Sequence, residues 1–147
     1  MIPILIMQIF IFPFAATIIM NTWTDSRRTL ELQEIAGHLG SSMQQLYYTI
    51  NHASISSGSL TAQPDTPSFI DGYSYNVTLF DATTSASVKI MNITVNLVGA
   101  HNEASSLITL GENVAWPGNL TFTSYKISVI NATKTAGNIW LSFNGGN

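Results

Sequence analysis

The first 20 residues of the chain form an apolar run without a single charged side chain. Gln8 is the only strongly polar residue among the first 16. As an α-helix the run would be about 30 Å long, which is enough to cross the hydrocarbon core of a bilayer. The sequence contains no second run of this kind. The pattern therefore predicts that residues 1–20 lie in lipid or in an equally apolar protein core, while the rest of the chain faces water.

Beyond the apolar run, hydrophobic residues recur with the period of one helix face. Six of them follow one another at spacings of 3, 4, 4, 3 and 4 residues: Leu32, Ile35, Leu39, Met43, Leu46 and Ile50. This spacing is close to a heptad seam. We therefore predict one long helix over residues 3–53, with 21–25 as the place where it would be interrupted, because Asn, Thr and Asp favour helix caps. Pro13 removes one hydrogen bond inside it.

From about residue 70 the hydrophobic period changes to two. Residues 73–79 and 88–97 alternate between apolar and polar side chains, and a slip in phase near Met91 indicates a β-bulge. Further strands are expected at 107–110, over 120–130 as one strand or two, and at 139–143. The predicted fold class is α+β: a long N-terminal helix, hydrophobic and then amphipathic, followed by a C-terminal antiparallel β-sandwich of immunoglobulin-like type. Its parts are a helix over 1–53, a Ser-, Gly- and Pro-containing linker over 54–68, and a head domain over 69–147.

Three interpretations of the apolar run are possible. A cleaved secretory signal would need a basic start and a shorter apolar core, and only Ala15-Ala16 is a weak cleavage site. A single-pass anchor fits the length, but Arg27-Arg28 after the run would place the C-terminal part inside the cell. The third interpretation is a processed subunit whose basic leader has been removed, so that Met1 is the first mature residue.

Composition narrows the classes of function. Charged residues make up only 9% of the chain and the net charge is −3, so an electrostatic footprint for nucleic acid is absent. Ser and Thr number 16 each and Asn 12, which suggests an extracellular or heavily solvated surface. The absence of cysteine excludes disulfides, thiolate catalysis and Cys-based zinc sites. No phosphate-binding loop, nucleophile elbow or zinc-binding helix occurs, and we expect no catalytic residue, no metal and no cofactor.

Four Asn-X-Thr sequons occur, all in the predicted β region. Their acceptors are Asn76, Asn92, Asn119 and Asn131. Asn76 and Asn92 fall on the polar face of their predicted strands. If these sites carry N-linked glycans, the β domain lies outside the cell. The alternative is that they are bare polar strand edges.

An apolar N-terminal helix that continues as an amphipathic helix into a β-rich domain resembles the archaeal type IV pilins and the related archaellins. The resemblance is carried by the uncharged start at 1–20, the helix pattern through Leu46-Tyr47-Tyr48 and the Thr-rich, sequon-bearing strands. Bacterial type IV pilins usually have a glutamate at the fifth mature position, whereas this chain has Leu5, which favours the archaeal type. The resemblance implies a pilin-like fold, removal of a leader, assembly by dedicated machinery and a frequently glycosylated outer domain.

The predicted function is that of a structural subunit of an extracellular helical filament, serving adhesion or motility, with copies of itself as partners and the membrane as its location before assembly. The residues expected to form the contacts between subunits are Ile4, Leu5, Ile9, Phe10, Phe12, Phe14, Ile18, Ile19, Leu32, Ile35, Leu39, Met43 and Leu46. Part of the distal seam would alternatively be covered by the chain's own β domain. The alternative function is a monomeric, membrane-anchored surface protein whose β-sandwich binds a ligand. Such a protein would need a recognisable ligand cleft or an exposed aromatic patch. The candidates for the patch, although such residues more often belong to the core, are Tyr73, Tyr75, Trp116, Tyr125 and Trp140.

Overall fold

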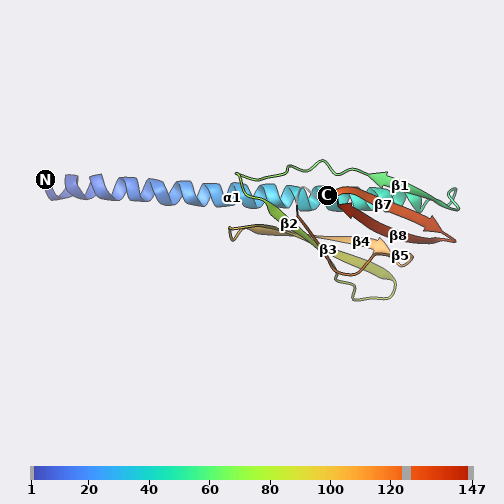
Figure 1. The fold of residues 1–147 in the computed structure, drawn as a ribbon. Helices are drawn as coiled ribbons and strands as arrows, with labels where there is room; N and C mark the ends of the chain where they lie inside the picture. The colour runs from blue at the N-terminus through green and yellow to red at the C-terminus, as the bar shows by residue number, and fades with distance from the viewer. Residues whose placement is uncertain (1, 124–126, 146–147) are drawn as a thin grey trace.

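A single helix, α1 (Ile2–Ile50), forms the axis of the molecule. The computed structural model describes residues 2–123 and 127–145. Figure 1 shows that the helix runs straight from one end of the molecule, and that all strands gather around its C-terminal half. At 49 residues the helix is about 74 Å long. The predicted long helix is confirmed, and it passes through 21–25 without interruption, because Thr22 and Thr24 bond to carbonyls of the helix itself and leave it intact.

Among the described residues, eight strands follow the helix and form two four-stranded sheets. The first sheet has the order β1-β7-β8-β5 and the second the order β4-β3-β2-β6. The strands, in chain order, are β1 (Gly58–Ala62), β2 (Tyr75–Asp81), β3 (Val88–Leu97), β4 (Glu103–Gly111), β5 (Val114–Ala115), β6 (Leu120–Thr123), β7 (Ile127–Thr135) and β8 (Asn138–Gly145). All pairings are antiparallel except that of β5 with β8, which is parallel. The expectation of a purely antiparallel arrangement is therefore wrong at β5.

Two local expectations are corrected by the strand pairing. Residues 58–62, placed in the linker by sequence, form β1 and pair with β7, so the segment is part of the first sheet. No bulge occurs near Met91, because the register of β3 with β2 and β4 runs without a shift. Val88 and Ile90 simply lie on the outer face, and the inward series begins at Met91. The register shift of the structure lies between Ile127 and Val129 instead.

One hydrophobic core is shared by the helix and both sheets. It takes Leu32, Leu39 and Ile50 from α1, each at most 1% exposed, together with inward residues of β2, β3, β7 and β8. The C-terminal half of the helix is therefore an integral part of the β domain. Because the core residues of 32–50 contact strands of both sheets, the head cannot be defined by residues 69–147 alone.

The far end of the helix is tied to the sheets by polar contacts. Tyr47 donates from its hydroxyl to Oδ1 of Asn113 at 2.8 Å, and Asn113 donates to Oδ1 of Asn51 at 2.8 Å and to the carbonyl of Gly137 at 2.9 Å. Burial raises the pKa of the Tyr47 phenol. The buried Lys134 donates to the carbonyl of His52, just after the helix end, where a cation is favoured by the helix dipole.

Candidate assembly surface

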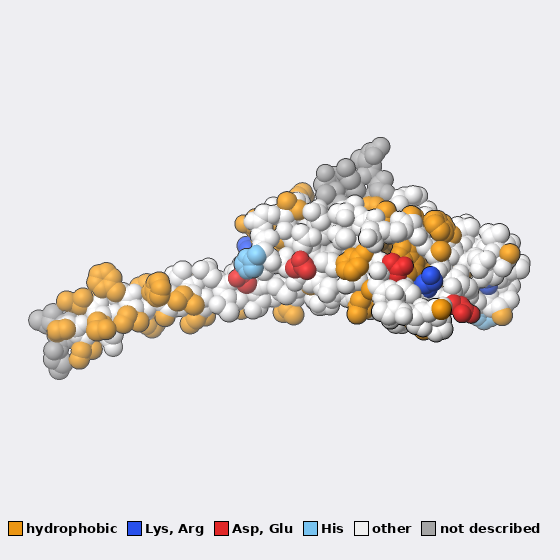
Figure 2. All heavy atoms as spheres, turned by 90° about the horizontal axis from the view of Figure 1, so that it is seen from below, with side chains coloured by type: hydrophobic (Ala, Val, Ile, Leu, Met, Phe, Trp, Pro, Cys, Tyr) orange, Lys and Arg blue, Asp and Glu red, His pale blue; other side chains and the backbone are white. Residues whose placement is uncertain are grey.

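The N-terminal part of α1 extends beyond the sheets as a bare helix. Every residue from Pro3 to Asn21 with a described side chain is exposed, and Ile9, Phe10 and Phe12 are 67%, 72% and 78% exposed. Figure 2 shows this projecting stalk covered in hydrophobic side chains with no charged side chain on it. A helix that is apolar on every side is stable only inside lipid or a protein core. We define residues 3–20 as the stalk.

The residues predicted to form the contacts between subunits divide into two groups. The stalk presents all eight of the N-terminal group to the outside: Ile4, Leu5, Ile9, Phe10, Phe12, Phe14, Ile18 and Ile19. The other five are at most 7% exposed, inside the core of their own chain: Leu32, Ile35, Leu39, Met43 and Leu46. The prediction that this second group faces other copies is corrected, because the chain's own strands cover the seam.

Threonine hydroxyls in the stalk and just beyond it bond to carbonyls of the same helix. Thr17 donates from its hydroxyl to the carbonyl of Pro13 at 2.9 Å, and Thr22 makes the same contact with the carbonyl of Ile18. Hydroxyls bonded back to the carbonyl four residues earlier are compatible with an apolar surrounding. Pro13 has no N–H, so the carbonyl of Ile9 lacks its helical donor.

By length and composition, α1 contains one segment suited to crossing a membrane. The 18-residue window that carries this property has a mean hydropathy of 2.2, and none of it is buried inside the molecule. The charge-free stalk ends shortly before Trp23, which is 63% exposed. Tryptophan is enriched at the ends of membrane-spanning helices.

Two arginines and one aspartate join the helix to the sheets where the stalk ends. Arg27 donates to both carboxylate oxygens of Asp71, at 2.7 and 2.6 Å, and Arg28 donates from Nε to Oδ2 at 3.1 Å. The Arg27 guanidinium also lies 5.1 Å from the ring centroid of Trp23, and that of Arg28 lies 5.0 Å from the ring centroid of Tyr73. We call Arg27, Arg28 and Asp71 the Asp71 clamp. The sequence contained no signal for it, because its members are 43 and 44 residues apart.

The contacts of the clamp shift the pKa of Asp71 and the pKa of Arg27. Hydrogen bonds from Arg27 and then Arg28 lower the pKa of Asp71, and the same bond raises the pKa of Arg27. Asp71 has a positive φ of 50°, a conformation that Asp and Asn tolerate better than most residues. The turn at Asp71 therefore presents its carboxylate to the helix at the base of the head.

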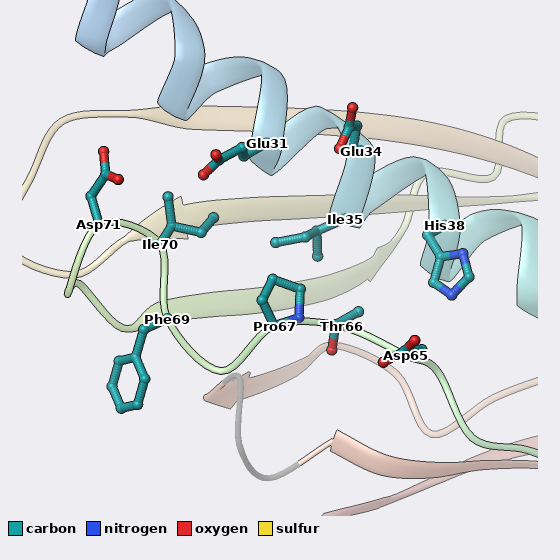
Figure 3. Close-up of a pocket in the computed structure, with 10 residues that line it drawn as sticks. All are labelled: Glu31, Glu34, Ile35, His38, Asp65, Thr66, Pro67, Phe69, Ile70 and Asp71. Atoms are coloured by element: carbon teal, nitrogen blue, oxygen red, sulfur yellow. The ribbon is translucent and has the colours of Figure 1, made fainter.

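A hollow of about 670 Å³ lies beside the clamp, between α1 and residues 65–71. Glu31, Glu34 and His38 of the helix line it, and Figure 3 shows Asp65 and Asp71 on the facing segment. Within residues 2–123 and 127–145, no group of three His, Cys, Asp or Glu side chains is arranged to hold a metal ion. The hollow is an acidic groove bordered by apolar side chains such as Ile35 and Ile70.

Three of the four sequon asparagines lie on strands with their side chains on the outer face of a sheet, and the fourth lies in a bend. Asn76 and Asn92 alternate with buried residues of β2 and β3, and Asn119 is exposed in the bend before β6. The hydroxyl of Thr94 donates to Oδ1 of Asn92 at 3.4 Å. Asn131 lies on β7, where its Oδ1 is buried without a hydrogen-bond partner.

The aromatic candidates do not form one patch. Trp116 and Tyr75 are buried, and the Tyr75 hydroxyl donates to the carbonyl of Pro67. Tyr73 covers Arg28 at the base of the head. Trp140 is 48% exposed on β8, and Tyr125 lies outside the described residues.

Comparison of the chain with protein-family models, with curated protein sequences and with solved structures finds no match in any of the three. The fold and the exposed stalk are therefore the basis for a functional argument.

Proposed function

We propose that the protein is a structural subunit of an extracellular helical filament, and that the stalk assembles it with copies of itself. The observation that carries the proposal is the division of one helix into two halves. Its C-terminal half buries one face against the strands of both sheets, whereas Pro3–Met20 is bare on every side. An anchor alone would also be bare, but it would not need a rigid continuation into the core of the head.

The free energy of apolar burial favours a stalk that is shielded from water. Burying apolar surface contributes about 25 cal/mol per Å², so an apolar helix of this length would gain on the order of tens of kcal/mol relative to water. Relative to lipid the gain is far smaller, because lipid tails are equally apolar and packing must decide. Transfer of the stalk from the membrane into a filament core therefore calls for assembly machinery.

The head fits the outside of such a filament. Its two sheets present Ser, Thr and Asn side chains and four sequons, which suits a glycosylated, pilin-like coat of immunoglobulin-like architecture. Packing of one stalk against another by a contact that does not close on itself would propagate as an open helix. Adhesion to surfaces is the role that we favour, with motility as the other role of such filaments.

The test is electron microscopy of material sheared from cells that carry the full chain, with mass spectrometry of the filament band. We expect thin, uniform filaments composed mainly of this chain. Ile9→Asp, at a position 67% exposed on the stalk, should abolish them. The matched control is Leu107→Asp, at a head position 64% exposed, which should leave assembly intact.

The second candidate is a membrane-anchored monomer with a ligand-binding head, and the suitability of the stalk for crossing a membrane favours it. It predicts that the chain is recovered only from detergent-extracted membranes as a monomer. In that case Ile9→Asp would reduce membrane insertion without any filament being lost, and the filament proposal would be abandoned.

A further inference from the structure

Phe80 lies between two sequon asparagines on the outer face of the second sheet. It alternates with buried residues of β2, so its ring points outward, and the register pairs it with Asn92 on β3. On the other side, Leu79 pairs with Leu120, which brings Asn119 next to the end of β2. The backbone N–H of Asp81 donates to Oδ1 of Asn119 at 3.4 Å, consistent with this placement.

The first sheet repeats the arrangement with Trp140. This residue is 48% exposed on the outer face of β8 and pairs with Thr133, the threonine of the Asn131 sequon. Asn131 lies two residues earlier on the same face of β7, opposite Ser142. Diagonal neighbours on adjacent strands are about 7–8 Å apart, which is within reach of an aromatic side chain. The register therefore makes Asn131 a diagonal neighbour of Trp140 on the outer face of the first sheet.

The surroundings of Trp140 suit a polyhydroxylated ligand without net charge. The ring borders a hollow of about 370 Å³ that is also lined by Thr133, Thr135 and Asn138. Lys89 and Glu112 line it with opposite charges. A sugar ring has one apolar face of C–H groups that can stack on an aromatic ring, and hydroxyls at its edge that hydroxyl and amide groups can bind.

Asn76 provides an internal contrast. The register places Asn96 and Thr123 opposite it on the neighbouring strands. Its sequence neighbour Tyr75 is 1% exposed and points into the core. Over the part of the chain that the structure describes, Asn76 is thus a sequon without an outward aromatic residue on an adjacent strand.

We propose that Phe80 and Trp140 are stacking platforms for the first sugar of the chain's own N-glycans. Phe80 serves a glycan on Asn92 or Asn119, and Trp140 serves a glycan on Asn131. The inference rests on the glycosylated coat of the proposed function. The glycosidic bond itself forms elsewhere: a transferase joins Asn Nδ2 to the anomeric carbon of a sugar-phosphate donor, the donor loses its phosphate-bearing group, and the amide loses one proton.

The test begins with the site occupancy of the full chain, isolated from its glycosylating source and measured by glycopeptide mass spectrometry. Thermal unfolding is then compared in a double-mutant cycle of Asn131→Gln and Trp140→Ala. We expect Asn131→Gln to lower Tm by about 2–6 °C when Trp140 is present and to have little effect in the Trp140→Ala background. Trp140→Phe retains an aromatic ring and should keep most of the coupling. A second cycle combines Asn92→Gln or Asn119→Gln with Phe80→Ala. The Asn→Gln change should again lower Tm when Phe80 is present and have little effect in the Phe80→Ala background.

Asn76→Gln is the matched control, because it removes a sequon that has no outward aromatic neighbour among residues 2–123 and 127–145. Its effect on Tm should be the same with and without Phe80→Ala. Equal losses for Asn131→Gln in both Trp140 backgrounds would overturn the inference and leave the glycosylated coat standing. Unoccupied sequons at Asn92, Asn119 and Asn131 would overturn both the inference and the coat, whereas filaments seen by microscopy would still support the assembly proposal.

A free sugar from solution could also stack on Trp140, and fluorescence distinguishes it from the chain's own glycan. Trp140 is monitored by fluorescence, with Trp140→Phe as the reference that subtracts Trp23 and Trp116. In the glycosylated chain, a panel of neutral mono- and disaccharides should not quench Trp140, because the chain's own glycan covers the ring. Saturable quenching in the glycosylated chain would show that the ring is open to external sugar and would overturn the assignment.

Discussion

Gly40 of α1 lies so close to Ile108 of β4 that a Cβ atom at position 40 would stand 2.7 Å from Cγ2 of Ile108. Ile108 is 4% exposed and β-branched, so it cannot move aside without disturbing the core. The close approach of helix and strand thus depends on the missing side chain. Gly37 lies one turn earlier, and a Cβ atom added there would meet no neighbouring group within 4 Å.

This pair of glycines yields a matched stability prediction. Gly37→Ala should stabilise the chain by about 1 kcal/mol, because Ala is the better helix former. Gly40→Ala gains the same propensity but overpacks the core, at a cost of about 1–3 kcal/mol. Chemical unfolding should therefore place Gly40→Ala below Gly37→Ala by about 1–3 kcal/mol. Equal stability of the two variants would show that β4 can retreat from the helix.

A second prediction concerns Tyr47 and Tyr48, which are adjacent but differently placed. Tyr47 is 4% exposed and donates to Asn113, whereas Tyr48 is 60% exposed. Tyr47→Phe leaves a polar oxygen of Asn113 without its donor, and we expect a loss of about 1–3 kcal/mol in urea unfolding. Tyr48→Phe is the control and should change stability by less than about 0.5 kcal/mol.

The same phenol gives a prediction at alkaline pH. Burial raises the pKa of Tyr47 above its ordinary value near 10, so the unfolded chain ionises first. The contribution of the buried phenol to stability is complete below the pKa of the unfolded chain, and it is lost as the pH rises through the pKa of the folded chain. Unfolding curves between pH 8 and 11 should show a smaller decline for Tyr47→Phe than for the unmodified chain. An identical decline in both would assign the alkaline loss to other groups.

The Asp71 clamp predicts a loss of stability in acid, whereas Tyr47 predicts a loss in alkali. Because its two arginine partners lower the pKa of Asp71, the clamp's contribution is present above the ordinary aspartate pKa of about 3.9 and is lost as the pH falls through the lower, folded value. Asp71→Asn keeps the residue's tolerance of positive φ and removes the charge. The variant should be less stable at pH 6 and should lose less on acidification below about pH 4. Asp65→Asn, on the same segment, is the control and should follow the unmodified chain.

Two glutamines on α1 cover the open edge of β4. Gln33 donates to the carbonyl of Ser105 and Gln44 to the carbonyl of Thr109, each at 3.3 Å. Gln44→Glu would replace a donor by an acceptor opposite a carbonyl, so we expect a loss of about 0.5–1.5 kcal/mol and a greater tendency to aggregate through that edge. Gln45→Glu is exposed beside it and adds the same charge without touching β4. Light scattering that rises equally in both variants would assign the effect to charge alone.

Several features of the fold and the site follow from short-range sequence patterns. The helix over 2–50 follows from its uninterrupted hydrophobic spacing, and most strands follow from alternation over five to ten residues. The presence of the stalk could be predicted from composition alone, because an uncharged apolar run of that length is unfavourable in water. The placement of Asn76 and Asn92 on outer faces could be predicted because both residues alternate with apolar residues along their strands.

Other features depend on which distant segments meet, which no local pattern records. The spacing of Leu32, Ile35 and Leu39 predicted a buried face but could not say whether another copy or the chain's own sheets would bury it. The Asp71 clamp and the Gly40–Ile108 approach join segments that are more than 40 residues apart. β1 escaped prediction because a five-residue strand with Gly and Ser becomes recognisable only when β7 lies beside it.

The sequence by itself therefore determined that this protein has a bare apolar helix joined to a water-facing β region, because hydrophobic period and charge are local properties. Only the tertiary structure decided that the exposed part of the helix ends near the clamp, that Asn92 and Asn119 lie at the strand positions beside Phe80, and that Asn131 lies diagonally across from Trp140. The physical reason is that strand register and sheet order are set by packing of the whole core around α1. Neighbours across strands are consequences of that packing, and the order of residues along the chain does not specify them.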